Sequence, residues 1–326
     1  METVRVGGRK YSDPDVISLI RATGELVDPR SAVVNQARKL NREYRSYEGG
    51  PSNPLRRLEI MASLRGLTVS PMNIERRKSE SRDAVLIPSG NARRTKGQIL
   101  YNPLRPAGRT AFSIAHEISH TFFPNTITGA RFRDLTAADS REANELERLC
   151  DLAASELLMP IEEFQVEVRG FFSLARTEEL AEKFGSSFEA TVFRLATAHP
   201  EVAIAGLLRY RRRLDEERKL RVPIQESLFI DLKDASYEAP RPKYRRQSFF
   251  ASASCGDEYL IRWNKSFEEE SCVYAAAKSA GICSAIEVLP NRAGQAGLLE
   301  VVRAPFQRDD AHAECPDLLF FWSALG

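Results

Sequence analysis

The chain has 326 residues, of which 43% are hydrophobic and 28% charged, and its formal net charge of +2 at pH 7 favours no strongly charged partner. No apolar run approaches the roughly 18 residues of a membrane span, and the first residues lack the apolar core of a secretory signal. The five cysteines show no framework spacing, so we expect a cytoplasmic protein with reduced thiols.

The first part of the chain predicts two helices and a pair of strands. Ser31–Tyr47 indicates a helix that the Gly- and Pro-rich segment 48–54 ends, and Leu55–Leu67 indicates a second. Asp83–Pro88 and Gly97–Asn102 are short runs rich in Val, Ile, Leu and Tyr, which predict paired strands. The basic loop between them has the composition of a solvated hairpin tip.

The segment Thr110–Pro124 predicts a helix that carries a metal site. It contains His116-Glu117-Ile118-Ser119-His120, an H-E-x-x-H pattern, although the whole chain has only 4 histidines. Residues four apart leave the same face of a helix one turn apart, so both imidazoles can bind one zinc ion. Glu117 lies beside them as a general base for water. The alternative is an amphipathic helix with two histidines and no metal.

The third ligand of a catalytic zinc site must come from outside this helix. Asp139 resembles the capping residue of a next helix that runs to Met159. Its acidic candidates are Glu142, Glu145, Glu147 and Glu156. Glu147 is preferred, because Asp151 follows four residues later on the same face and can accept a hydrogen bond from a ligand histidine. Otherwise Glu147 is a surface carboxylate paired with an arginine.

Four segments carry a family resemblance. They are Leu64-Arg-Gly-Leu-Thr-Val69, the strand-pair end Ile99-Leu-Tyr-Asn102, Arg109-Thr-Ala-Phe-Ser-Ile-Ala-His-Glu-Ile-Ser-His120, and Glu147-x-x-x-Asp151 followed by Leu-Ala-Ala-Ser-Glu-Leu-Leu-Met-Pro160. Together they resemble the ImmA/IrrE family of zinc metallopeptidases. The resemblance implies a mainly helical, zincin-like domain with a small β-sheet. It also implies that His116, His120 and Glu147 hold Zn²⁺ and that Glu117 is the catalytic base.

Cys150 departs from the family, which more often has alanine at this position. It follows Glu147 by three residues on nearly the same helical face, where a thiol could approach the metal and act as an inhibitory or redox-sensitive group. The plainer interpretation is a small buried hydrophobe. The donor that would stabilise the oxyanion also stays open among Arg109, Tyr101 and Arg141.

Beyond Pro160, Ser173–Thr197 predicts a helix-turn-helix-like pair. Its second helix begins with Ser187-Phe-Glu-Ala-Thr and offers no basic residue, so we expect it to pack on the peptidase core rather than bind DNA. Ala203–Tyr210 predicts a strand. The following run to Arg221 carries both charge signs, which is typical of a solvated linker, and we place a domain boundary near 212–222.

The last hundred residues predict an α+β domain. A helix is expected at Glu268–Ser279, and strands are expected at Ser227–Leu232, Ser248–Ser252, Tyr259–Trp263, Ala285–Leu289 and Leu298–Arg303. The family resemblance implies a GAF-like sensor here. A basic and aromatic cluster could bind single-stranded nucleic acid, or it could be a polar surface strand; it comprises Lys243, Tyr244, Arg245, Arg246, Phe249 and Phe250.

The chain as a whole is therefore expected to be an α+β protein with a peptidase domain (1–165), a helix-turn-helix-like subdomain (166–212) and a GAF-like regulatory domain (213–326). The resemblance implies an endopeptidase that cleaves a helix-turn-helix transcriptional repressor and so derepresses a stress-response or phage-defence operon. Single-stranded nucleic acid is a candidate activator. The alternative is a non-catalytic DNA-binding or ligand-sensing regulator on a peptidase scaffold, and the presence of Glu117 favours the enzyme.

Overall fold

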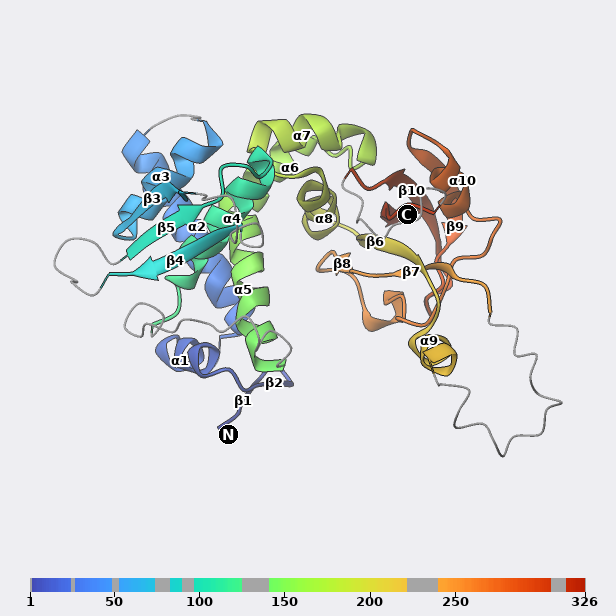
Figure 1. The fold of residues 1–326 in the computed structure, drawn as a ribbon, viewed down its shortest axis with the longest axis horizontal. Coiled ribbons are helices and arrows are strands. Elements are labelled where there is room, and N and C mark those ends of the chain that lie inside the picture. Colours follow the sequence, from blue (N-terminus) through green and yellow to red (C-terminus); the bar gives the residue numbers. More distant parts are fainter. Residues whose placement is uncertain are drawn as a thin grey trace. The chain divides into compact units, whose positions relative to one another are not determined.

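The protein, seen here as a computed structural model, has a mixed α+β fold (Figure 1). The structure describes residues 2–24, 27–48, 53–73, 83–89, 97–124, 141–221, 240–305 and 315–325. Contacts divide the chain into two compact units. The first comprises Met1–Arg169 with Glu178–Ala190, and the second comprises Gly170–Thr177 with Thr191–Gly326.

Helices dominate the first unit, where α4 packs on α5 and α5 packs on α2. The predictions at 31–47, 55–67 and 139–159 are confirmed to within a few residues. The sequence left the first thirty residues unassigned, yet they form a β-hairpin and α1, whose start is capped by the carboxylate of Asp13. The helices are α1 (Pro14–Ala22), α2 (Pro29–Glu48), α3 (Pro54–Leu64), α4 (Ala107–His120), α5 (Arg141–Leu158), α6 (Ile161–Val168) and α7 (Thr177–Phe184).

Small sheets complete this unit. A hairpin pairs β1 (Val4–Val6) with β2 (Arg9–Tyr11). The other sheet has the order β3-β5-β4, with β3 parallel and β4 antiparallel to β5. The predicted strand pair is thus confirmed as β4 (Ala84–Pro88) and β5 (Gly97–Tyr101), and β3 (Leu67–Pro71) is added. Gly66 ends α3 at φ 77, a backbone conformation that favours glycine, so the predicted helix stops short of Leu67.

The turn before α8 (Phe188–Ala198) lies against the start of α4. A β-carbon on Gly108 would come within 2.5 Å of the carbonyl oxygen of Ser186 and 2.7 Å of the Ser187 nitrogen. Only glycine permits so close an approach of two backbones. The α7–α8 turn therefore packs on the helix that carries His116 and His120.

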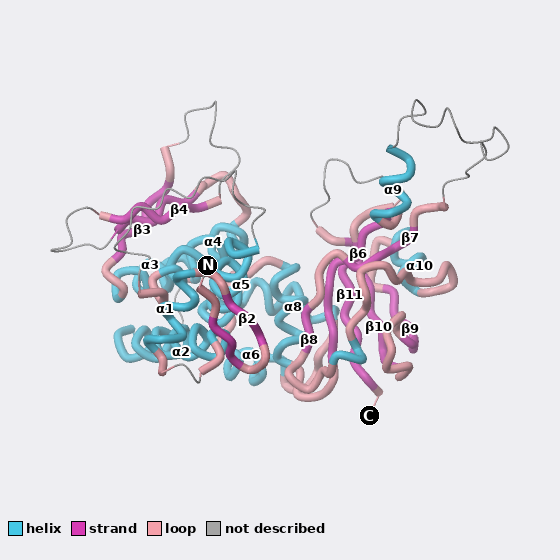
Figure 2. Tube along the Cα trace, turned by 90° about the horizontal axis from the view of Figure 1, so that it is seen from below, coloured by secondary structure: helices cyan, strands magenta, loops and turns pink. Residues whose placement is uncertain are grey.

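A six-stranded antiparallel sheet forms the second unit, in the order β7-β6-β11-β10-β9 with β8 also pairing with β6 (Figure 2). One face packs on α10 (Cys272–Lys278) and buries Tyr244, Phe320 and Trp322. The strands are β6 (Ala203–Arg211), β7 (Lys243–Arg246), β8 (Phe250–Ala251), β9 (Cys283–Val288), β10 (Ala296–Arg303) and β11 (Leu318–Ala324). The charged run after β6 forms α9 (Leu214–Arg221).

Several expectations differ from this architecture. Tyr259–Trp263 is not a strand. Its first residue ends a short 3-10 turn, Asp257–Tyr259, and Arg262 faces solvent. The strand β11 was not foreseen, whereas β7 agrees with the strand alternative for the segment that begins at Lys243. Because β6 is a central strand of the second sheet, the contact-based division falls before it rather than near residues 212–222. The strand expected at Ser227–Leu232 lies outside the described residues.

Candidate metal centre

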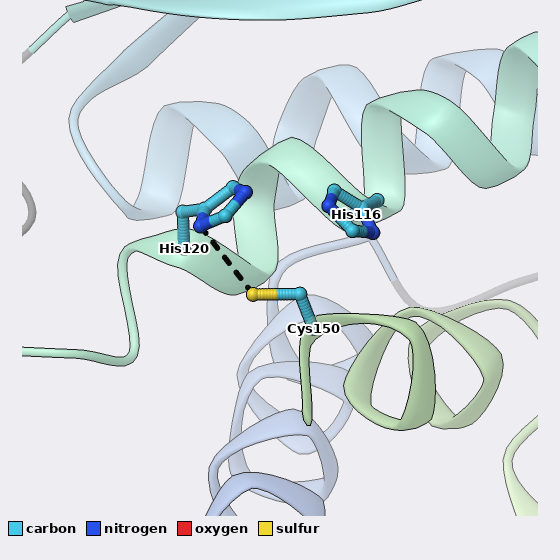
Figure 3. Close-up of side chains that lie close together, drawn as sticks. All are labelled: His116, His120 and Cys150. Carbon is cyan, nitrogen blue, oxygen red and sulfur yellow. Dashed lines mark hydrogen bonds between the residues drawn. The ribbon is translucent and has the colours of Figure 1, made fainter. Parts of the chain in front are cut away.

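Two packed helices of the first unit, α4 and α5, bring the candidate metal ligands together. His116 and His120 leave the same side of α4, one turn apart, and Cys150 faces them from α5 (Figure 3). The apolar residues of α4 that separate these positions, Ala115 and Ile118, are fully buried. The helical period thus places the apolar stripe in the core and the two histidines beside it, as the sequence predicts.

His116, His120 and Cys150 offer ligand atoms that all lie within 4.8 Å of one another. The Cys150 sulfur lies 3.4 Å from Nδ1 of His120, and both side chains are buried. Two ligands of one tetrahedral zinc ion lie roughly 3.3–3.6 Å apart, given metal–ligand bonds of about 2.0–2.3 Å. Imidazole nitrogen and thiolate sulfur are donors that zinc prefers, so these residues fit a zinc ion.

Carboxylates contact both ring nitrogens of His116. Nε2 lies 2.9 Å from Oε2 of Glu147, and Nδ1 lies 2.8 Å from Oδ1 of Asp151. A neutral imidazole has one N–H, so it can donate to only one of two carboxylate acceptors. The other ring nitrogen meets its carboxylate favourably when the ring carries a second proton or a cation lies beside Nε2. The structure therefore brings Glu147 and Asp151 to the first histidine and Cys150 to the second.

Glu117 projects toward the small sheet. Its Oε2 atom accepts a hydrogen bond of 2.9 Å from the backbone N–H of Leu86 in β4. Since β4 is an edge strand of the β3-β5-β4 sheet, this contact holds the carboxylate at the sheet edge. The sequence did not indicate this contact, because a backbone donor leaves no mark on the choice of side chain.

Two acidic alternatives for the third ligand have other partners. Glu145 accepts hydrogen bonds from the backbone nitrogens of Ser12 and Asp13, at 2.9 and 3.2 Å. Glu156 is buried and pairs with Nε of Arg38 at 3.0 Å. Both carboxylates thus tie α5 to neighbouring segments. The side chain of Glu142 lies outside the described residues.

The candidate oxyanion donors have different surroundings in the structure. Arg109 donates to Asp83 with an Nε–Oδ2 distance of 2.6 Å, which joins the start of α4 to the residue before β4. Tyr101 is half-buried at the end of β5. The side chain of Arg141 lies outside the described residues.

The expected nucleic-acid surface of the second unit is not formed as predicted. Tyr244 is buried with its hydroxyl donating to the carbonyl of Pro316, and Arg245 is only 3% exposed. Both side chains are enclosed because β7 pairs with the central strand β6. Lys243 lies 3.6 Å from a carboxylate oxygen of Glu268. The prediction is therefore wrong for Tyr244 and Arg245, which cannot stack on or contact a nucleic acid.

Comparisons with known proteins agree with this architecture. The model of the IrrE N-terminal-like domain, peptidase family M78, matches residues 69–196, which include α4 and α5. A solved structure described as a Mycobacterium tuberculosis transcriptional regulator is similar in fold, with a TM-score of 0.51 and 16% sequence identity over 94% of this chain and 80% of that one. No curated protein matches the sequence significantly. Among the described residues, no helix is long and apolar enough to cross a membrane. Residues 69–196 of this chain are therefore similar in sequence to the IrrE N-terminal-like domain of peptidase family M78.

Proposed function

We propose that this protein is a zinc-dependent endopeptidase in which His116, His120 and Glu147 hold the metal and Glu117 is the general base. The observation that carries the proposal is the meeting of α4 and α5, where Glu147 contacts Nε2 of His116 at 2.9 Å. The match of residues 69–196 to a peptidase family supports it, because the match includes every one of these residues.

The described side chains have distinct parts in this mechanism. A bound zinc ion would supply Lewis acidity toward water and the scissile carbonyl. Glu117 accepts a proton from the attacking water and returns it to the leaving amine. The Leu86 N–H orients the Glu117 carboxylate, and Asp151 fixes the ring of His116 through Nδ1.

We include Cys150 in the proposal as an inhibitory or redox-sensitive thiol. Its sulfur contacts His120, so it can occupy a coordination position that the attacking water needs. A cation nearby favours the thiolate form, which is both the better ligand and the more oxidisable species. The fully buried position of Cys150 supports equally a packing role, and spectroscopy separates the two.

The proposed substrate is a helix-turn-helix transcriptional repressor, whose cleavage would derepress a stress-response or phage-defence operon. The family resemblance supports this substrate, and the fold likeness to a transcriptional regulator is compatible with it. We propose that α7 and α8 are the helix-turn-helix-like pair and that the second unit is a GAF-like regulatory domain. A peptidase that destroys a repressor must stay inactive until a signal arrives.

The test compares cleaved N-termini in cells that express the wild type or Glu117→Gln, with Glu182→Gln as a control on the exposed face of α7. If the protein is a peptidase, new N-termini appear in cells with the wild type or Glu182→Gln but not in cells with Glu117→Gln. One of these new N-termini should lie within a helix-turn-helix protein. The Glu117→Gln variant should keep its metal. If it changes transcription as the wild type does, the non-catalytic alternative is correct.

A further inference from the structure

An arginine and aromatic cluster lies on the second unit, at the ends of β6 and β7. Arg211 ends β6, Arg246 ends β7, and the loop after the 3-10 turn supplies Trp263. The guanidinium carbon of Arg211 lies 4.2 Å from the centre of the Trp263 ring, and that of Arg246 lies 5.9 Å from the same ring. Phe249 also contacts Arg246, at 5.3 Å. Aromatic contacts hold both guanidinium planes.

These charges are not neutralised within the part of the chain that the structure describes. There, neither Arg211, Arg245 nor Arg246 forms an ion pair with a carboxylate. Arg245 and Arg211 donate instead to backbone carbonyls, such as those of Asn264 and Trp263. The buried Nε atoms of Arg211 and Arg246 have no hydrogen-bond partner among the described residues, and such groups cost free energy.

The electrostatics of the cluster are those of an anion site. Burial lowers the pKa of Arg211 and Arg245, and the repulsion from neighbouring arginines lowers both further. Carboxylates of α9 oppose this lowering of the pKa: Glu217 acts on Arg211, and Glu216, which also pairs with Arg213 at 3.8 Å, acts on Arg245. Two half-buried cations held close together are stabilised by a ligand that carries two negative charges and several acceptor oxygens.

We propose that Arg211, Arg246 and Trp263 form a binding site for a phosphate group. A dianionic phosphate matches the two guanidinium charges, and its oxygens can accept from N–H groups of Arg246. The phosphate can belong to a small phosphorylated molecule or to a nucleic-acid backbone, since the recognising chemistry is shared. This site is separate from the metal centre, and its test does not depend on peptidase activity.

Intrinsic fluorescence gives a local signal for the test. The chain has 2 tryptophans, and the other one, Trp322, is fully buried. Inorganic phosphate, added to the full chain at constant ionic strength, should change the Trp263 emission with a saturable dependence, while acetate at equal charge should not. Adenosine monophosphate and a short single-stranded oligonucleotide, titrated in parallel, decide whether a small molecule or a polymer binds more tightly.

Arg246→Gln should weaken phosphate binding by about tenfold or more, since a charge-assisted contact is lost. Arg262→Gln removes the same charge from an exposed neighbour of Trp263 and should stay within about twofold of wild type. If Arg246→Gln does not fold, Arg246→Lys, which keeps the charge without the planar fork, replaces it and should also bind more weakly. No saturable response to any of the three phosphate probes, or equal weakening in Arg246→Gln and Arg262→Gln, would overturn the proposal.

Discussion

Oδ1 of Asp151 lies 2.8 Å from Nδ1 of His116, so a carboxylate on α5 fixes the ring of a histidine on α4. An imidazole held through Nδ1 presents Nε2 in one orientation, toward Glu147. A carboxylate behind a metal-binding histidine both sets the tautomer and raises the basicity of the ligand nitrogen. In the proposed metal centre, the contact would therefore tie metal affinity to a residue that does not need to touch the metal.

Replacing Asp151 with Asn should lower zinc affinity by about 10- to 100-fold, the usual cost of removing such a partner. The matched control is Asp257→Asn, because Asp257 is exposed on the second unit. Competition with a chromogenic chelator measures the affinity. Unchanged affinity in Asp151→Asn would mean that the contact with His116 has no part in metal binding.

The position of Cys150 predicts a spectroscopic difference. If the sulfur that lies 3.4 Å from His120 binds the metal, the cobalt(II)-loaded protein shows a thiolate-to-cobalt charge-transfer band. We expect this band in wild type and Asp257→Asn and its loss in Cys150→Ser. A cobalt-loaded wild type without the band would assign Cys150 to packing alone.

Glu145 should matter for stability rather than for metal binding. Its carboxylate accepts from the backbone nitrogens of Ser12 and Asp13, so Glu145→Ala leaves two donors without partners. We expect a loss of about 1–3 kcal/mol in the free energy of unfolding, against a change within about 0.5 kcal/mol for Glu182→Ala. Urea unfolding measures both. Loss of zinc from folded Glu145→Ala would instead indicate that Glu145 is a ligand.

His199 should make the second unit less stable in mild acid. Burial beside Phe172 and Phe321 lowers its pKa, and Glu201 opposes the shift. The neutral ring is therefore favoured in the folded state, and its stabilising contribution is present above the unfolded pKa of about 6.5 and lost as pH falls below it toward the folded pKa. When the pH is lowered from 7.5 to 5.5, the urea concentration at the unfolding midpoint should fall by more in wild type than in His199→Gln. An equal fall in both would contradict this assignment.

The periodic patterns predicted most of the first unit because its helices have one apolar face. The same patterns failed at β11, whose run Leu-Leu-Phe-Phe-Trp is buried on both sides and shows no alternation. Tyr259–Trp263 failed for the opposite reason, since Tyr, Leu, Ile and Trp suit a strand but none of the strands that the structure describes pairs with them.

The histidine pair could be located from sequence because its spacing matches one helical turn. The partners of the pair could not, since they depend on how α5 packs against α4. Packing is what puts Cys150 beside His120. Likewise, Arg245 and Arg246 are adjacent in sequence, yet the sheet buries the first and leaves the second half-buried.

Elemental analysis of zinc is the most direct test of the central claim. Purified, zinc-loaded wild type should contain about one zinc per chain, and the folded double variant His116→Ala/His120→Ala should contain almost none. The Glu117→Gln variant should keep the full amount, because a general base for water is not needed to bind the metal. Equal zinc in wild type and the double variant, or no zinc in the loaded wild type, would contradict the proposed metal centre.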